Sequence, residues 1–331
     1  MSAASPRRHR PTGRSPGHLL RLALAFFAIY VVWGSTYLAI RYAVEAIPPL
    51  TTAGLRHLVA GGILFAHATG RGLRATRHHW RASLVLGALF FLVGHGALHW
   101  AEQIVPSGLA ALIIATEPVW IALLFALPPH RRRVGQSAVA GLILGLLGVA
   151  LLMRGDLLGM SAQHAIGGLA VLASSIAWSA GVCYSSRARL PTDPLLRTAT
   201  TLLAGSALLL GTAVVAGEPA RLTAAALAPR PLLALLYLIV FGSLVAYTAY
   251  MWLLERCSPT LVATHTYVNP VVAMLLGWAI EGEPLTAPVL AAAALILTAV
   301  VLVGRGAPAE TSPASRADDT PEAEPAPPRV W

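Results

Sequence analysis

The chain has 331 residues, of which 56% are hydrophobic and only 11% are charged, and its mean hydropathy is +0.68. Soluble domains carry about a quarter charged residues, so this composition excludes an ordinary soluble protein and indicates an all-α polytopic membrane protein. The net charge of +10 is distributed in short arginine clusters between apolar stretches. That pattern is typical of loops near anionic lipid, and not of a nucleic-acid-binding surface.

Apolar stretches near the roughly 20 residues that a helix needs to cross a bilayer follow one another along the chain. We predict ten spans, at residues 20–40, 50–69, 82–100, 107–127, 136–153, 166–186, 196–216, 231–254, 259–280 and 284–304. Residues 1–19 form a basic tail, and the span after it has no small-residue cleavage site, which predicts an uncleaved helix and no signal peptide. Residues 305–331, rich in Pro, Ala and Glu, are expected to be disordered.

The basic residues, all of them arginine, alternate between rich and poor segments. Of the 24, only Arg41, Arg154, Arg221 and Arg230 fall in segments that ten spans place outside, and Arg56 lies within a span. Cytoplasmic loops carry an excess of Lys and Arg. The sequence therefore predicts a multi-pass protein of the bacterial inner membrane with both termini, including the basic and disordered tails, in the cytoplasm.

One sequence pattern occurs twice, 152 positions apart, in Trp100–Trp120 and Trp252–Val272. Each copy begins with a proline-serine turn and is interrupted by an X-Pro, where X is Glu117 in the first copy and Asn269 in the second. A proline inside an apolar span frees a backbone carbonyl, and a polar side chain beside it needs partners or water. Two such broken spans at matching places in two halves indicate a transporter's binding site.

The chain divides into two units, residues 20–153 and 166–304, with five predicted spans each. Because five is odd, the second unit enters the membrane from the opposite side, so the repeat is inverted. Inverted repeats place a solute site near the bilayer midplane, and rocking one unit against the other gives alternating access.

Four stretches carry a family resemblance: WGSTYLAIRYAVEAIPPL (33–50), AGLRHLVAGG (53–62), WAEQIVPSGLAALIIATEPVW (100–120) and YVNPVVAMLLGWAIEGEPLT (267–286). They closely resemble the EamA domains of the drug/metabolite transporter superfamily, and in particular its YedA-like branch. The resemblance implies two EamA domains, ten helices and a central cavity lined mainly by the first, third, fourth, sixth, eighth and ninth spans. It also implies export of small organic solutes such as amino acids or related metabolites. Similar proteins often have Asn in the third-span motif where this chain has His95, so specificity is not carried across.

Two charged residues lie well inside predicted spans, away from the span ends. Arg56 is costly there unless it is paired or hydrated, and two roles are open: a structural one, in which it snorkels or binds helix-end carbonyls, and contact with a solute or anion. Glu117 lies in the middle of its span and is expected to be protonated, paired with Arg56 or a histidine, or lining water. It is our candidate for carrying a coupling proton, although the repeat places uncharged Asn269 at the equivalent position.

Other polar and aromatic candidates pair at helical spacing. His95 and His99 are four residues apart, as are His265 and Asn269, which places each pair on one helical face. HxxxH alone is weak evidence for a metal, and we expect a polar stripe facing the cavity. Trp33 and Tyr37 form another such pair, with Trp178 at a corresponding place in the second half, and they either line the cavity or pack between helices. Small residues Gly141, Gly145 and Gly148 predict close packing within the bundle.

No motif for catalysis, a cofactor or a metal is found, since GRSPG at 13–17 lacks the P-loop lysine and His99–Glu102 is not HExxH. We therefore predict a transporter and not an enzyme, with a small-molecule substrate, lipid and protons as partners. Export by alternating access with proton exchange is preferred, and a passive channel or facilitator is the alternative. A lipid-modifying enzyme is a third class. The substrate, direction of net flux, coupling ion, stoichiometry and the choice between monomer and homodimer stay open.

Overall fold

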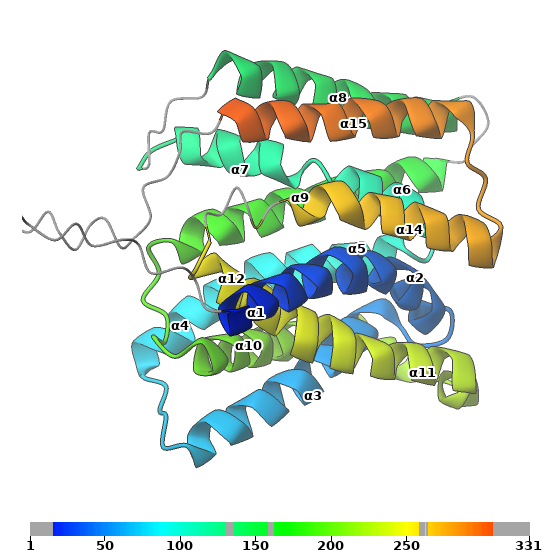
Figure 1. The fold of residues 1–331 in the computed structure, drawn as a ribbon. Helices are drawn as coiled ribbons and strands as arrows, with labels where there is room; N and C mark the ends of the chain where they lie inside the picture. The colour runs from blue at the N-terminus through cyan, green and yellow to red at the C-terminus, as the bar shows by residue number, and fades with distance from the viewer. Residues whose placement is uncertain (1–15, 130–134, 158–161, 258–261, 263, 307–331) are drawn as a thin grey trace, which may run out of the picture.

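The computed structural model describes residues 16–129, 135–157, 162–257, 262 and 264–306, and the regular elements among them are all helices (Figure 1). Most of the two predicted tails lies outside the described residues. In chain order the elements are α1 (Pro16–Phe27), η1 (Ala28–Val32), α2 (Trp33–Val44), α3 (Pro49–Gly70), α4 (Arg77–Leu86), η2 (Gly87–His95), α5 (Gly96–Ala101), α6 (Ser107–Ile114), α7 (Glu117–Ala126), α8 (Gln136–Leu157), α9 (Ala162–Ser185), α10 (Pro194–Val215), η3 (Glu218–Arg221), η4 (Ala224–Leu227), α11 (Pro229–Tyr237), η5 (Leu238–Tyr247), α12 (Thr248–Leu254), α14 (His265–Glu281) and α15 (Ala287–Gly306).

Six helical stretches in the described part are long and apolar enough to cross a membrane. They are Gly17–Val44, Arg77–Ala101, Ser107–Ala126, Ala162–Ser185, Pro194–Val215 and Pro229–Leu254. Helix α3 has the length but carries Arg56, His57 and His67, and α14 and α15 contain shorter apolar helices. The predicted all-helical membrane architecture is confirmed, whereas the number of ten crossings stays a prediction.

Three of the long stretches contain a wide π-helical turn in their interior: η1, η2 and η5. A π-helix inserts residues into the α-helical ladder and leaves carbonyls free to accept other donors, and it is frequent at functional sites. Two of these turns border the cavity described below, because Trp33 follows η1 and His95 ends η2, whereas Ser243 in η5 lies behind the cavity wall. Hydropathy carries no signal for such turns, so the sequence analysis predicted unbroken spans here.

Two pairs of helices pack closely across the halves of the chain: α3 against α10, and α8 against α15 (Figure 1). Small residues make these contacts close. A Cβ placed on Gly148 would lie 2.7 Å from Ile296 Cγ1, and one placed on Gly145 would lie 3.5 Å from the Ala299 Cβ. The small-residue stripe on α8 therefore packs inside the bundle, as its spacing predicted.

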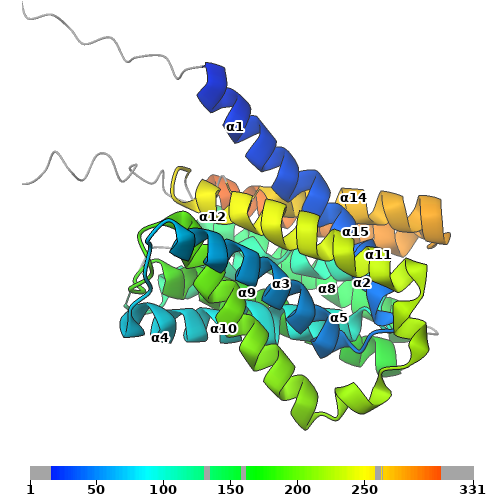
Figure 2. The same ribbon diagram turned by 90° about the horizontal axis from the view of Figure 1, so that it is seen from below.

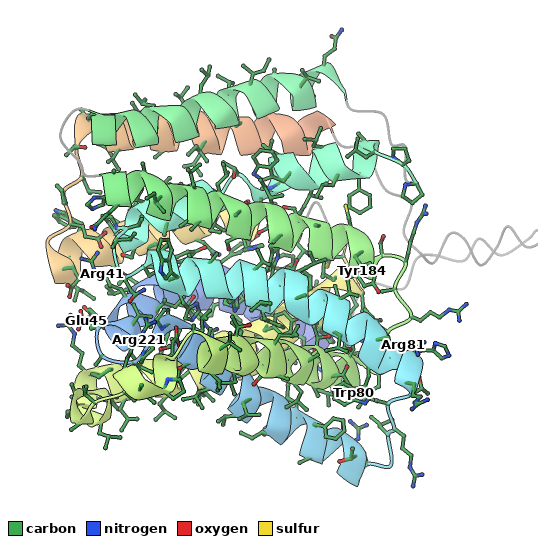
Figure 3. The ribbon with its side chains drawn as sticks, turned by 180° about the vertical axis from the view of Figure 1, so that it is seen from behind. Arg41, Glu45, Trp80, Arg81, Tyr184 and Arg221 are labelled. Atoms are coloured by element: carbon green, nitrogen blue, oxygen red, sulfur yellow. The ribbon has the colours of Figure 1, made fainter. Side chains whose placement is uncertain are left out.

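The first helices of the two halves run in opposite directions. Arg41, near the end of α2, lies at one end of the bundle, and Tyr184, near the end of α9, lies at the other (Figure 3). Figure 2 shows that α1 diverges from the other helices toward its N-terminal end.

Two hydrophobic clusters fill the interior. Tyr37 and Leu98 belong to one cluster, and Trp33 and Trp178 to the other. The cavity described next is lined by members of both clusters, so it lies where they meet.

Candidate substrate-binding cavity

A buried cavity of about 60 Å³ lies between helices from both halves of the chain. Its lining residues are Trp33, Thr36, Tyr37, Ile40, Arg56, His95, Leu98, Ile114, Glu117, Ser174, Trp178, His265 and Asn269. A water molecule occupies about 30 Å³ in the liquid, whereas organic ligands occupy pockets of roughly 300–1,000 Å³. The cavity in this conformation has room for water, and it has to widen before an organic solute can enter.

Every predicted site residue except His99 lines this cavity. His99 is fully buried, and its Nδ1 donates to the His95 carbonyl, one helical turn earlier, at 2.7 Å. The His95–His99 pair therefore contributes only its first member to the cavity.

Glu117 begins α7, directly after the break that ends α6 at Ile114. The X-Pro break predicted for the first copy of the repeat is therefore present, with Pro118 in the first turn of α7. The side chain is 3% exposed, and its carboxylate has no ion pair or hydrogen bond with any described residue. A carboxylate at the start of a helix is favoured by the partial positive charge of the free N–H groups there. The unpaired carboxylate faces the cavity.

Arg56 is 2% exposed, so its side chain does not extend to the surface as a snorkelling arginine would. Its Nε donates to Ser243 Oγ at 3.0 Å, and the described residues supply no acid within ion-pair distance. Gly242 allows this placement, because a Cβ there would lie 2.7 Å from Arg56 Nη2. Pairing with Arg56 was one of the alternatives open for Glu117, and no such pair is present among the described residues. One cavity therefore contains a cation and a carboxyl group that are not paired with each other.

Aromatic rings from both halves enclose one side of the cavity. The Trp33 and Trp178 ring centroids are 5.9 Å apart at an interplanar angle of 84°. Tyr250 and His265 pack against Trp33, with centroid distances of 5.0 and 5.3 Å. Trp33 Nε1 donates to the Gly242 carbonyl at 3.1 Å, which ties α2 to the wide turn η5. Such rings can hold the apolar part of a solute or a cationic group.

Asn269 bonds to the wide turn of the first span. In the amide orientation that satisfies its hydrogen bonds, its nitrogen donates to the carbonyls of Tyr30 at 2.7 Å and Ile29 at 2.9 Å. The second copy of the repeat is not broken at this X-Pro, since Pro270 lies inside the continuous helix α14. The break predicted at Pro270 is therefore wrong, because α14 begins four residues before Asn269, at His265.

Two matches to the EamA-like transporter family cover residues 20–154 and 165–305. The chain belongs to that family. It is 40% identical over 291 residues to the uncharacterised inner membrane transporter YedA of Escherichia coli K12, covering 87% of this chain and 92% of that protein. It is also 29% identical over 289 residues to protein PecM of Dickeya dadantii, covering 85% and 92%. A solved crystal structure aligns with a TM-score of 0.61 and 25% identity, covering 86% of this chain and 97% of the other.

The EamA-like transporter has site residues that the sequence analysis missed. Thr36, Ile40, Leu98, Ile114 and Ser174 also line the cavity. Apolar and hydroxyl side chains are ordinary in membrane helices, so no signal marks them. His57 and Ser243 lie behind the lining and bond to Arg56 or His95. A histidine beside Arg56 in an apolar span was a usable signal, because intramembrane ionisable residues are rare.

A network around Glu283 joins the two halves of the transporter at one end of the bundle. Glu283 Oε1 lies 2.7 Å from Arg41 Nη1 on α2 and accepts from the backbone N–H and the hydroxyl of Ser107, at 3.2 and 3.0 Å. Gly108 N–H donates to Oε2 at 3.4 Å. Since Arg41 and Ser107 belong to the first half and Glu283 to the second, the carboxylate bridges them.

A second network lies at the same end, where Figure 3 places Arg41 and Glu45. Arg230 Nη2 on α11 is 2.7 Å from Glu281 Oε1 and 3.8 Å from Glu45 Oε1. Tyr42 donates to the same Glu281 oxygen at 2.6 Å. At the opposite end, Glu255 pairs with Arg197 at 2.8 Å and with Arg256 at 3.0 Å, and all three residues belong to the second half.

Proposed function

We propose that this protein exports a small organic metabolite, an amino acid or a related compound, by alternating access and in exchange for protons. The observation that carries the proposal is the cavity itself, in which Arg56 and Glu117 lie beside aromatic rings from both halves and neither is ion-paired with a described residue. A guanidinium binds a carboxylate through charge-assisted hydrogen bonds, and a carboxylate with aromatic faces suits an ammonium group. A zwitterion presents both groups.

The proposed topology has ten spans, with residues 20–153 and 166–304 as inverted repeats and both termini in the cytoplasm of the inner membrane. Three observations support it. Arginines are concentrated in the segments assigned to the inside, α2 and α9 end at opposite ends of the bundle (Figure 3), and YedA is named an inner membrane transporter. In this topology the end that holds Arg41, Glu45 and Glu283 faces the periplasm.

The small cavity and the network at one end support alternating access. The cavity has to widen to admit a solute, and the Glu283 network joins the two halves on the proposed periplasmic side. Breaking that network while the opposite end closes would expose the cavity to the outside. Export as the net direction rests on the resemblance to the drug/metabolite transporter superfamily.

Glu117 is the proposed proton carrier. It is buried in the cavity and has no protein partner among the described residues, so its charge is balanced either by a proton or by a cationic solute. Binding of one would displace the other, and such competition is the physical basis for exchange.

Counterflow in proteoliposomes tests the proposal. Vesicles loaded with single unlabelled amino acids are diluted into the same labelled compound, and wild type is compared with Arg56→Gln, Glu117→Gln and the surface variant Glu45→Gln. We expect counterflow for at least one zwitterion, its loss in both cavity variants and its retention in Glu45→Gln. Transport and pH dependence that are unchanged in Glu117→Gln would contradict proton coupling.

A passive channel or facilitator is the second candidate, and the same assay separates the two. Preloaded solute accelerates uptake through a carrier, because the carrier returns across the membrane with solute bound. A pore has no such return step. Flux that is indifferent to preloading would favour the pore. The absence of any solute flux in wild type would leave the family assignment intact and reject the proposed substrate class.

A further inference from the structure

A chain of hydrogen bonds runs from Arg56 to the cavity through residues behind its wall. Arg56 Nε donates to Ser243 Oγ at 3.0 Å, and Ser243 Oγ lies 3.4 Å from His57 Nδ1. His57 Nε2 lies 2.8 Å from His95 Nδ1. Ser243 is fully buried and His57 is 1% exposed, so neither side chain exchanges these partners for bulk water.

The donor and the acceptor of each hydrogen bond in this series can be assigned by starting from Arg56. An arginine donates and never accepts, so Ser243 Oγ accepts from Arg56. Among the described residues, His57 Nδ1 is the acceptor within reach of the Ser243 hydroxyl proton, and we assign the proton to that bond. Neutral His57 then carries its proton on Nε2 and donates to His95 Nδ1. Neutral His95 in turn carries its proton on Nε2, because its Nδ1 is the acceptor.

Both imidazoles are expected to be neutral. A proton added to His57 or His95 would place a second positive charge near Arg56 in a medium of low dielectric constant, where repulsion is strong. A proton on His95 Nδ1 would also face the Nε2–H of His57 across the 2.8 Å contact. The described residues contain no group of three or more His, Cys, Asp or Glu side chains suited to hold a metal ion.

The His95 ring is held in place from two sides. Its plane is 20° from that of Trp178 at a centroid distance of 5.4 Å, and 25° from that of His57 at 4.9 Å. His95 Nε2 is bonded to no described residue, and His95 lines the cavity. A donor at His95 Nε2 would share this cavity with Arg56, which also lines it.

We propose that Arg56 and His95 form a donor site for the anionic or carbonyl oxygen of a solute, and that His57 and Ser243 are positioning residues that hold His95 in its Nε2–H tautomer. The site takes a carboxylate or a similar acceptor group and rejects cations. The choice of a carboxylate rests on the proposed function, whereas the tautomer of His95 does not. The two statements can therefore fail separately.

Nitrogen-15 NMR of the purified full chain with labelled histidine tests the tautomer. The His95 signals are identified by their loss in His95→Asn. We expect protonated Nε2 and unprotonated Nδ1 for His57 and His95 in wild type. In Ser243→Ala we expect a population with protonated Nδ1, because His57 loses the donor that orients it. Ser206→Ala is the matched control, since that buried hydroxyl bonds to the Gly54 carbonyl and not to a histidine. Protonated Nδ1 on His95 in wild type, or no change in Ser243→Ala, would overturn the proposal.

A titration of the same samples tests the ligand class without any transport assay. Acetate is expected to shift the His95 Nε2 signal in wild type. The apparent affinity for acetate is expected to be at least threefold weaker in Ser243→Ala. Methylammonium at the same concentration is expected to leave the signal unchanged. The same change is measured in a His95→Asn background, which keeps an N–H donor, by tryptophan fluorescence titrations with acetate. Adding Ser243→Ala is expected to weaken acetate binding less in this background than in wild type, because only the bond from Arg56 to Ser243 is then lost. A His95 Nε2 shift with methylammonium equal to that with acetate would contradict the donor site. So would an equal loss of acetate affinity when Ser243→Ala is added to wild type and to His95→Asn.

Discussion

Arg41 and Glu283 form an ion pair between the two halves of the chain, with Arg41 Nη1 2.7 Å from Glu283 Oε1. The pair is one part of a network, because Ser107 donates to the same carboxylate oxygen through its N–H and its hydroxyl. Arg41 is partly exposed, so the ion pair alone is screened by water. The Glu283 carboxylate is only 12% exposed. We therefore expect the hydrogen bonds that Ser107 donates to it to stabilise the contact between the two halves more than the ion pair does.

We predict that Glu283→Gln opens the cavity toward this end. Hydrogen bonds to charged groups contribute roughly 1.5–3 kcal/mol, which corresponds to an accessibility increase of about tenfold or more. The measurement is labelling of Ile40→Cys by a membrane-impermeant maleimide, in a background without Cys183 and Cys257. Glu45→Gln, which removes an exposed pair at the same end, is the control and is expected to have little effect. Equal labelling in all variants would show that the hydrogen bonds of Glu283 do not keep the cavity closed at this end.

Gly242→Ala is predicted to weaken the binding of carboxylate-bearing solutes. A Cβ at this position would lie 2.7 Å from Arg56 Nη2 and 3.1 Å from Thr36 Cγ2, so the guanidinium has to move. Overpacking of this kind costs roughly 1–3 kcal/mol, and we expect an increase in KM of about tenfold. Gly211→Ala is the matched control, since a Cβ there meets nothing within 4 Å. Similar KM values for the two variants would show that Arg56 does not contact the solute.

Glu102 lies in the turn after α5. We predict that ionisation of its carboxyl group destabilises the folded protein at high pH. It is 2% exposed, and neither carboxylate oxygen has a hydrogen-bond partner among the described residues. Burial, together with the charge of Glu283, raises the pKa of this carboxyl group well above its usual range. Because the folded-state pKa is the higher one, the full stability is present below the unfolded-state pKa of about 4.3 and decreases as the pH rises above it.

Replacing this carboxyl group tests the sign of the effect. Glu102→Gln is expected to raise the midpoint of thermal unfolding in detergent above neutral pH and to leave it unchanged in acid, where the wild-type group is also neutral. The control is Glu255→Gln, which removes a carboxylate paired with Arg197 and is expected to lower stability at neutral pH. A Glu102→Gln effect of equal size at all pH values would contradict the titration argument.

Asn269→Leu is predicted to destabilise the first span at its wide turn. The substitution leaves the Ile29 and Tyr30 carbonyls without the amide donor of the second repeat, and an unsatisfied buried group costs roughly 1–3 kcal/mol. Thermal unfolding measures this loss. Gln103→Leu removes an exposed amide that bonds to the Trp100 carbonyl and is expected to be neutral. Equal stability of the two variants would show that water replaces the Asn269 amide at η1.

Much of the architecture could be predicted because hydropathy is a local property. A run of apolar residues predicts a membrane helix wherever it packs, and a buried charge such as Glu117 or Arg56 is conspicuous in such a run. The repeat also needed only the sequence, since Glu117-Pro118 and Asn269-Pro270 occupy equivalent places in two similar segments. Eight of the residues that line the cavity were identified in this way. Polar side chains in apolar spans are expected to gather where they can meet water or one another.

The partners of these residues were decided by the tertiary structure. No local pattern predicts that Asn269 bonds to the carbonyls of η1, that Ser243 accepts from Arg56, or that His57 lies behind His95. His99 follows His95 by one α-helical turn and does not line the cavity, so helical spacing alone did not decide which of the two residues reaches it. Composition and the repeat by themselves determined that this chain is a helical membrane protein with polar groups at equivalent positions of two similar segments. Which of those groups stay unpaired depends on contacts between helices far apart in the sequence, because packing and hydrogen bonding across the bundle are properties of the folded chain.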